Sequence, residues 1–354
     1  MEHKVEVEIS EVAKKKESIC NGCSNNCRYC STREIKSRLH SQSSDWATEQ
    51  VDVMKAFNTG YRKVRDNDPS TYDIVFPTTH DITLNTLGAS LAFLKKVLVA
   101  GNTVLITTKP NPVCIQALTM ELAPWKSQIH LRLSITAMDE GLLKYWEPNA
   151  PSFQQRFIAL KDCFNKGFKT SVNIEPALDI PNLPVLVDTV MPFVTDKIWI
   201  GKMNHANRCV VVETEEDRVQ LERILNSQED LHFWNLYHKL KSNPKIGYND
   251  SMRTVINPLI EKQQHKAQTD SPLPKESVSS QPEPVEISSH GVVASDFAFE
   301  LLKVFSERQA AQFQQLQLIE DIVAPFVSSH PELQKVNEIL KTLKPKSRNG
   351  FNLN

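Results

Sequence analysis

The sequence predicts an α/β protein built from repeated strand–helix units around a parallel sheet. Between about residues 72 and 205, short β-branched runs alternate with longer segments whose apolar residues recur about every three to four positions. Polar residues follow each of the predicted strands in this region. Because ligands bind at the carboxyl ends of the strands in parallel sheets, these polar clusters predict one common binding surface.

The predicted strands are short apolar runs bounded by turn residues. One ends just before Cys20, and five more cover residues 72–77, 103–107, 129–135, 169–174 and 197–200. The polar clusters that follow the last five are Thr78–Asp81, Thr108–Lys109, Ser134 and Thr136, Asn173 and Glu175, and Lys202 and Asn204. Ordinary loop polarity is the alternative explanation for each residue taken alone.

Two predicted helices have recognisable ends. The first precedes Gly101, which would end it in a left-handed conformation. The second begins at Pro151 and ends at Gly167. Their predicted buried stripes are Leu84, Leu87, Leu91, Leu94 and Leu98 in the first, and Phe153, Phe157, Leu160 and Phe164 in the second. Helical patterns resume from about residue 214 to residue 240.

The chain divides into four predicted parts. Residues 1–257 form the strand–helix array and the helices after it. Residues 258–295 are rich in Pro, Ser and Gln and are predicted to be a disordered linker. Residues 296–345 form C-terminal amphipathic helices, and residues 346–354 a disordered tail. The apolar face of residues 296–345 needs a partner, which is the barrel, a second copy of the tail or a different protein.

Composition excludes several classes of protein. The 354 residues are 40% hydrophobic and carry a net charge of −1, so no overall field attracts nucleic acid. No apolar run approaches the ~20 residues that cross a bilayer, and residues 1–16 lack a secretion signal, so we expect a cytoplasmic protein without disulfides. The closest glycines are Gly88 and Gly101. This spacing excludes the dinucleotide fingerprint, the P-loop and the Gly-x-Ser-x-Gly elbow.

Four of the seven cysteines fall between Cys20 and Cys30. In a reducing compartment, thiolates this close in sequence are ligands of a metal or a cluster. Structural zinc sites usually use two cysteine pairs separated by a longer loop, whereas iron–sulfur clusters accept compact runs. The spacing therefore favours an iron–sulfur cluster. The other cysteines, Cys114, Cys163 and Cys209, are expected to be buried and unreactive.

The run Cys23-x-x-x-Cys27-x-Tyr29-Cys30 resembles the three-cysteine motif of the radical S-adenosylmethionine (radical SAM) superfamily. The resemblance implies that three thiolates bind three irons of a 4Fe-4S cluster. The fourth iron binds the amino and carboxylate groups of S-adenosylmethionine (SAM), and one electron then yields methionine and a 5'-deoxyadenosyl radical. It also implies an electron donor such as flavodoxin or ferredoxin. Cys20 is then expected to be a spectator that does not bind the cluster. Its alternative roles are a hydrogen donor or an alternative cluster ligand.

Further stretches resemble the spore photoproduct lyase and DNA repair photolyase-like branch of that superfamily. They are Thr107–Pro110, Leu133–Thr136, Trp146–Pro151, Arg156 and Val172–Pro176. This resemblance implies a partial (β/α)6 TIM-like barrel, with the cysteine loop after the first strand. It covers roughly residues 18–207 and does not extend to the tail.

The same resemblance implies a set of cofactor-binding residues. Lys109 would contact the methionyl carboxylate, Ser134 the ribose or the carboxylate, and Tyr29 would pack by the adenine. Arg156 is a second candidate for the carboxylate, and a surface ion pair is its alternative. Glu175 would touch the ribose or the substrate. Glu147 would bind a hydroxyl group or simply end a loop before Pro148.

Candidates for proton or hydrogen transfer are His80, Cys209 and Tyr145. His80 is a proton donor or a substrate contact, and otherwise a plain loop histidine; Asp81 can fix its tautomer only if the loop curls. The lesion-repairing lyases place a hydrogen-donating cysteine where this chain has Thr78 and Thr79. A donor such as Cys209 or Tyr145 would then be required, or a different reaction.

Three functional hypotheses remain. The first is a radical SAM enzyme that acts on a nucleic acid base, aided by a local basic strip of Arg28, Arg33, Lys36 and Arg38. Solvated helix charges explain that strip equally well. The second keeps the chemistry with a peptide or small metabolite as substrate. The third is a non-catalytic iron–sulfur or zinc protein that recruits a partner through its C-terminal helices.

Overall fold

The computed structural model describes residues 13–39, 45–57, 60–64 and 71–269. These residues belong to the first of two units, which spans residues 1–273. The predicted helices of residues 296–345 and the predicted tail of residues 346–354 lie outside the described residues. Most of the predicted linker does so as well.

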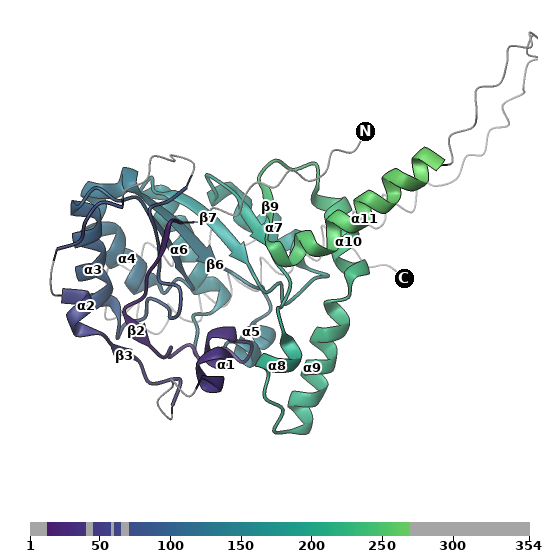
Figure 1. Cartoon of the computed structure of the whole chain (residues 1–354), viewed down its shortest axis with the longest axis horizontal. Coiled ribbons are helices and arrows are strands. Elements are labelled where there is room, and N and C mark those ends of the chain that lie inside the picture. The colour runs from purple at the N-terminus through teal and green to yellow at the C-terminus, as the bar shows by residue number, and fades with distance from the viewer. Residues whose placement is uncertain (1–12, 40–44, 58–59, 65–70, 270–354) are drawn as a thin grey trace, which may run out of the picture. The chain divides into compact units, whose positions relative to one another are not determined.

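Seven strands of the described chain form one open, parallel sheet (Figure 1). In spatial order they are β1 (Lys15–Lys16), β4 (Ile74–Phe76), β5 (Val104–Thr108), β6 (Ile129–Ser134), β7 (Lys169–Ile174), β8 (Ile198–Ile200) and β9 (Ile246–Tyr248). The described edge strands β1 and β9 do not pair, so the sheet is a partial barrel. A separate antiparallel pair, β2 (Cys20–Asn21) and β3 (Gln50–Val51), flanks the cysteine loop.

The predicted α/β architecture is confirmed, with one strand more than the six expected. All six predicted strands are present, and the cysteine loop follows the first of them. Strand β9 was not predicted because only three residues form it and one is Gly247, which leaves no alternating pattern to detect. This additional strand matters for the site, because the residues that follow it reach the end of β7.

Helices follow the strands in the expected alternation. The helices between the central strands are α3 (Leu87–Val99), α4 (Pro112–Glu121), α5 (Glu140–Trp146), α6 (Phe153–Asn165) and α7 (Leu183–Val190), with the 3-10 turns η1 (Ala123–Gln128) and η2 (Met191–Phe193). The others are α1 (Ser31–Arg38), α2 (Val53–Phe57), α8 (Ala206–Cys209), α9 (Glu215–Ser227), α10 (Asp230–Leu240) and α11 (Asp250–Thr269). No described helix has the length and apolarity that a bilayer crossing requires.

Helix α11 corrects the predicted start of the linker. It continues to Thr269, so the first residues of the range 258–295 are helical. Met252, Ile256 and Ile260 are each at most 1% exposed and recur every four residues. This stripe packs α11 against α10. The folded part of the chain therefore continues past residue 258, where the predicted linker begins.

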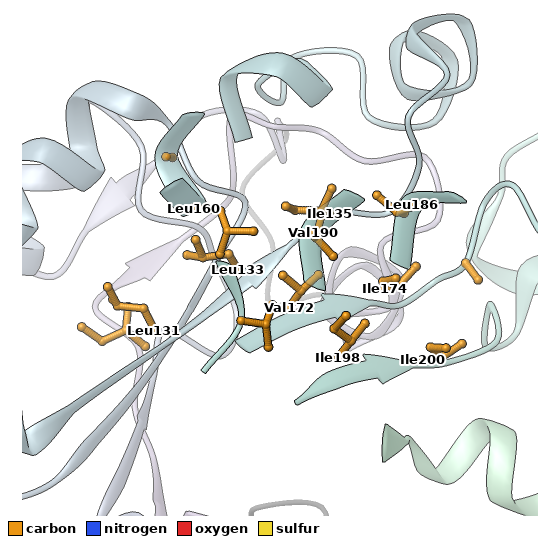
Figure 2. Packing of buried hydrophobic residues seen from close by; sticks show 14 of the residues in the cluster. Leu131, Leu133, Ile135, Leu160, Val172, Ile174, Leu186, Val190, Ile198 and Ile200 are labelled. Atoms are coloured by element: carbon orange, nitrogen blue, oxygen red, sulfur yellow. The ribbon is translucent and has the colours of Figure 1, made fainter. Parts of the chain in front are cut away.

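The core lies between the sheet and its covering helices (Figure 2). Leu131 and Leu133 of β6 and Val172 and Ile174 of β7 point toward helix residues that include Leu160. Each such side chain contributes roughly 1.5–3 kcal/mol when it is fully buried. Because strand side chains alternate, the intervening residues of β6 and β7 point to the other face of the sheet.

Both predicted helices end where expected, but the start of α6 and two stripe positions differ from the prediction. Gly101 has the predicted left-handed backbone, and so does Gly167. Helix α6 begins at Phe153 and not at Pro151, because Ser152 caps it. Leu84 is 60% exposed because α3 starts only at Leu87. Phe164 is 37% exposed, since the buried face of α6 runs instead through Arg156, Leu160 and Cys163.

Candidate active site

A cavity of about 410 Å³ opens at the carboxyl ends of the strands. Its volume lies in the range typical of small-molecule sites. The cysteine loop, the start of α1, Trp46 and the segments after β4, β5, β7 and β8 contribute its lining. The lining residues are Cys23, Cys27, Tyr29, Cys30, Ser31, Thr32, Trp46, Thr78, Thr79, His80, Asp81, Lys109, Glu175, Pro176, Lys202, Met203 and Asn204. Four of the five predicted polar clusters therefore meet at one surface, and the cluster after β6 is the exception.

The cysteine loop separates its four thiols into two sets. Cys23, Cys27 and Cys30 line the cavity, whereas Cys20 does not. The Cys20 sulfur lies 3.4 Å from the carbonyl oxygen of Asn21 and is buried. Gly22 makes the loop possible, because its φ is +90° and a Cβ there would lie 2.1 Å from the carbonyl oxygen of Thr48.

Burial raises the pKa of the two inner thiols. The pKa of Cys27 rises to about 12, against a lowering influence of the Lys109 ammonium, and the pKa of Cys23 is raised in the same direction. Cys30 caps α1, where its sulfur accepts a hydrogen bond from the Arg33 backbone N–H at 3.4 Å. Metal binding here therefore has to displace thiol protons.

The donor set fits a cluster with three protein ligands. Within the described ranges, no three His, Cys, Asp or Glu side chains form a group that could hold one metal ion. A 4Fe-4S cluster binds each thiolate through a different iron, so its ligands must share a cavity. Two buried polar atoms of lining residues, Trp46 Nε1 and Thr79 Oγ1, also have no hydrogen-bond partner in the described protein. Buried polar groups normally have partners, so both are consistent with a polar occupant.

Lys109 places a buried cation beside the three thiols. It follows β5, and its Nζ lies 4.0 Å from Glu147 Oε1 and 5.7 Å from the centre of the Tyr29 ring. Burial alone would lower the pKa of Lys109, but Cys27 and Glu147 raise it overall. Lys109 therefore presents a positive charge to an anionic ligand.

The end of β6 holds a buried ion pair in place of a ligand-binding surface. Arg156 is 0% exposed and donates hydrogen bonds to Glu147, to the Pro151 carbonyl at 2.7 Å and to the Ser134 carbonyl at 3.4 Å. The expected ion pair exists but is not at the surface, because α6 turns Arg156 inward. Neither Ser134 nor Arg156 lines the cavity.

Glu147 connects this ion pair to the cysteine loop. It accepts hydrogen bonds from the Tyr29 hydroxyl and from Thr136 Oγ1 at 2.9 Å. Burial raises its pKa, but Arg156 and Lys109 outweigh burial and lower the pKa overall. The Tyr29 hydroxyl is therefore engaged away from the cavity, while its residue still lines the cavity wall.

His80 lines the cavity, but both of its ring nitrogens are engaged. Nε2 accepts the Ile19 backbone N–H at 3.1 Å, so Nδ1 carries the proton and donates to the Asp81 carbonyl oxygen at 2.8 Å. Burial lowers the pKa of His80 and keeps the ring neutral. The backbone carbonyl of Asp81, and not its carboxylate, fixes the tautomer.

The carboxylate of Asp81 joins three segments around the site. It accepts hydrogen bonds from Asn25 Nδ2 at 2.9 Å, from the Lys109 backbone N–H at 2.9 Å and from the hydroxyl of Thr108. Asn25 lies between two of the lining cysteines. Asp81 therefore ties the cysteine loop to the end of β5, a role that sequence reasoning missed because no local spacing connects these residues.

Glu175 faces the cavity from the end of β7. Its two carboxylate oxygens accept hydrogen bonds from Asn249 Nδ2 at 2.6 Å and Ser251 Oγ at 3.0 Å. Burial raises the pKa of Glu175, partly offset by these two donors. Gly201 leaves room for the side chain, since a Cβ there would lie 2.6 Å from Glu175 Cδ. Asn249 and Ser251 follow the unpredicted strand β9, so sequence reasoning missed them too.

The structure does not bring Tyr145 and Cys209 into the cavity lining. The Tyr145 hydroxyl donates to Asp217 Oδ1 at 2.8 Å, and the Arg28 guanidinium lies over its ring at 4.4 Å from the centre. Hydrogen bonds from Tyr145 and Thr214 lower the pKa of Asp217 to about 2. Burial raises the pKa of the Cys209 thiol, on the short helix α8 that contacts α1.

The four residues of the predicted basic strip all have partners within the protein. Arg28 pairs with Asp217 at 2.9 Å, and Arg38 lies 3.8 Å from Glu34. Arg33 donates to the Arg28 carbonyl at 2.9 Å, and Lys36 donates to Asn21. The Arg33 and Lys36 contacts join α1 to the cysteine loop, whereas Arg28 is paired with α9 and Arg38 with a residue of its own helix.

Comparison with known proteins gives distant structural similarities only. No family model and no curated protein matches the chain. Spore photoproduct lyase complexed with dinucleoside spore photoproduct is 13% identical with a TM-score of 0.41, over 67% of this chain and 77% of that chain. SuiB of Streptococcus suis bound to S-adenosylmethionine is 13% identical with a TM-score of 0.34, over 50% of this chain and 38% of that chain.

The SuiB structure bound to its precursor peptide SuiA gives a TM-score of 0.36 at 13% identity, over 53% of this chain and 40% of that chain. The chain thus spans less than half the length of these two SuiB structures. We base the function on the residues of the site, because similarities at this level carry no functional argument.

Proposed function

We propose that this chain is a radical SAM enzyme, which cleaves S-adenosylmethionine reductively at a 4Fe-4S cluster to produce a 5'-deoxyadenosyl radical for hydrogen abstraction. One observation carries the proposal. The three cysteines of the Cys23–Cys30 motif line a single cavity with the buried cation Lys109, while the fourth nearby thiol, Cys20, is excluded. Three ligands from the protein leave one iron of such a cluster for the cosubstrate.

Different residues around the cavity would bind the cluster and the cosubstrate. Cys23, Cys27 and Cys30 would hold the cluster, which supplies the electron for cleavage of the sulfonium. Lys109 pairs with the methionyl carboxylate of SAM, because a buried ammonium needs an anion beyond Glu147 at 4.0 Å. Glu175 accepts hydrogen bonds from hydroxyl groups of the ribose or the substrate.

Other predicted site residues act indirectly in this scheme. His80 fastens the end of β4 to Ile19, and Arg156 keeps Glu147 ionised beneath Tyr29. Ser134 contributes its carbonyl oxygen to Arg156. Cys209 of α8 or Tyr145 of α5 would serve as hydrogen donor only after its helix moves toward the cavity. A nucleic acid base, a peptide and a small metabolite remain the substrate classes. The electron donor would be a flavodoxin or a ferredoxin.

The proposal is tested on anaerobically purified full-length protein reconstituted with iron and sulfide. With dithionite and SAM, we expect 5'-deoxyadenosine from the wild-type protein, measured by liquid chromatography. Cys27→Ala should lose both cluster absorbance and product, whereas the matched variant Cys20→Ala should keep both. Stoichiometric zinc in place of iron, or an intact reduced cluster that never cleaves SAM, would refute the proposal.

A second variant tests the role of Lys109. Lys109→Met removes a buried charged contact worth about 1.5–3 kcal/mol, so we expect SAM affinity to fall roughly 10-fold to 150-fold. Equilibrium binding of SAM to the reconstituted protein measures this loss. The iron content of Lys109→Met should match that of the wild type, and unchanged affinity would contradict the role.

A further inference from the structure

Trp46 belongs to the cavity wall, although the cysteine motif does not include it. It lies between α1 and β3 and is only 4% exposed. Its carbonyl oxygen accepts the backbone N–H of Cys23 at 2.8 Å, so the tryptophan backbone is bonded directly to the first motif cysteine. The neighbouring Thr48 carbonyl packs against Gly22, which fixes the same two segments together.

The indole N–H of Trp46 is a buried donor without an acceptor in the described protein. An indole nitrogen can only donate, and a buried donor left unsatisfied costs about 1–3 kcal/mol. The ring itself is well held, because Lys36 Nζ lies 5.9 Å from its centre and donates to Asn21. Because Trp46 lines the cavity together with the three thiols, a group bound there is the candidate acceptor for this N–H.

We infer that the Trp46 N–H donates a hydrogen bond to a sulfur of the cluster, either a cysteine thiolate or an inorganic sulfide. This inference rests on the proposed function, since the acceptor belongs to the cluster that the three thiolates would hold. Hydrogen bonds to the sulfurs are one of the factors that set the reduction potential of an iron–sulfur cluster. A donor stabilises the additional negative charge of the reduced cluster, so Trp46 should raise the potential.

Trp46 would thus be a positioning and tuning residue, with no direct contact to SAM required. Its effect should be visible in the cluster itself, even without SAM. Trp46→Phe keeps the aromatic ring and removes the donor. Trp125→Phe is the matched control, because Trp125 lies in η1 before β6, at the opposite end of the strands.

The experiment uses reconstituted full-length protein grown with ¹⁵N-labelled tryptophan. Pulsed electron paramagnetic resonance of the reduced cluster should detect a ¹⁵N coupling in the wild type and in Trp125→Phe, but not in Trp46→Phe. In a potentiometric titration, Trp46→Phe should shift the midpoint potential to a more negative value, with Trp125→Phe unchanged.

An intact wild-type cluster without ¹⁵N coupling would overturn the inference alone and leave the proposed function standing. This measurement needs no variant, so it decides the question even where Trp46→Phe fails to fold. Failure of the wild-type protein to assemble any cluster would overturn the proposed function, and this inference with it.

Discussion

One glutamate follows helix α5, which comes after β6, another follows β7 directly, and the two have opposite environments. Glu147, in the segment after β6, is 2% exposed and is paired with Arg156 and Lys109. Glu175, directly after β7, lines the cavity and is bound by the neutral donors Asn249 and Ser251. The pKa of Glu147 is accordingly lowered and that of Glu175 is raised.

This difference separates a residue that supports the site from one that forms it. A carboxylate neutralised by two cations in the interior has little capacity left for a ligand. A carboxylate held by two neutral groups at a cavity wall is compensated less, since Arg132 has the smallest influence on the pKa of Glu175, and its remaining lone pairs can accept hydroxyl donors. We therefore propose that the end of β6 supports the site and that the end of β7 contacts the ligand.

The largest expected effect comes from breaking the buried pair at the end of β6. Arg156→Met leaves Glu147 with only Lys109 as a cationic partner, so we expect a loss of about 3–5 kcal/mol in the free energy of unfolding. Urea denaturation of the protein without cluster measures it. Glu175→Gln, the corresponding change at the end of β7, should cost less than about 1.5 kcal/mol, because the amide oxygen still accepts from Asn249 and the Ser251 hydroxyl can accept from the amide N–H.

A double variant distinguishes pairing from packing at this position. Glu147→Gln with Arg156→Met removes both charges, so it should be more stable than Arg156→Met alone. Equal losses in the single and double variants would show that Arg156 acts through its volume and that the ion pair contributes nothing.

An intermediate effect is expected from crowding the end of β7. In Gly201→Ala the new methyl group would meet Glu175 Cδ at 2.6 Å, which forces the carboxylate out of its place between Asn249 and Ser251. We expect a cost of about 1–3 kcal/mol and a loss of SAM affinity, measured by denaturation and by equilibrium binding.

Gly88→Ala is the control for Gly201→Ala. A Cβ at Gly88 meets nothing within 4 Å, and Gly88 lies inside α3, so this change should stabilise the protein by about 0.5–1 kcal/mol. Unchanged SAM affinity in Gly201→Ala would exclude a contact of Glu175 with SAM and leave only the substrate as its ligand.

The sequence was sufficient for the fold and the three thiols because both depend on local patterns. Short segments of sequence are enough to predict the strands and the helix ends at Gly101 and Gly167. The same holds for the spacing of Cys23, Cys27 and Cys30. Lys109 and Glu175 follow predicted strands directly in the sequence, and both line the cavity at the carboxyl ends of those strands.

What the sequence did not reveal depends on contacts between distant segments. Arg156 is buried and paired with Glu147 because α6 turns this residue inward. The sequence placed Phe164 on the buried face of α6 and therefore did not predict this orientation of the helix. Asp81 bonds to Asn25, 56 residues away, and Glu175 to Asn249, 74 residues away. No spacing rule in one sequence connects residues so far apart.

The smallest expected effect is a difference in the pH dependence of stability between the two glutamates. Below pH 4.5 the unfolded chain binds a proton at Glu147 before the folded chain does, so this residue makes stability fall as the pH falls. Glu175 has the opposite sign, because the folded chain keeps its proton above pH 4.5 when the unfolded chain has lost it. Stability from Glu175 is therefore lost as the pH rises, by at most about 1.4 kcal/mol per pH unit.

Urea denaturation between pH 3.5 and pH 7 checks both signs without cluster or SAM. The stability of Glu175→Gln relative to the wild type should rise with pH, because glutamine resembles the protonated acid. The stability of the double variant Glu147→Gln with Arg156→Met, relative to the wild type, should rise as the pH falls below 4.5. The same slope in both comparisons would mean that the two carboxylates share one kind of environment, and the distinction between supporting and ligand-binding strand ends would then be lost.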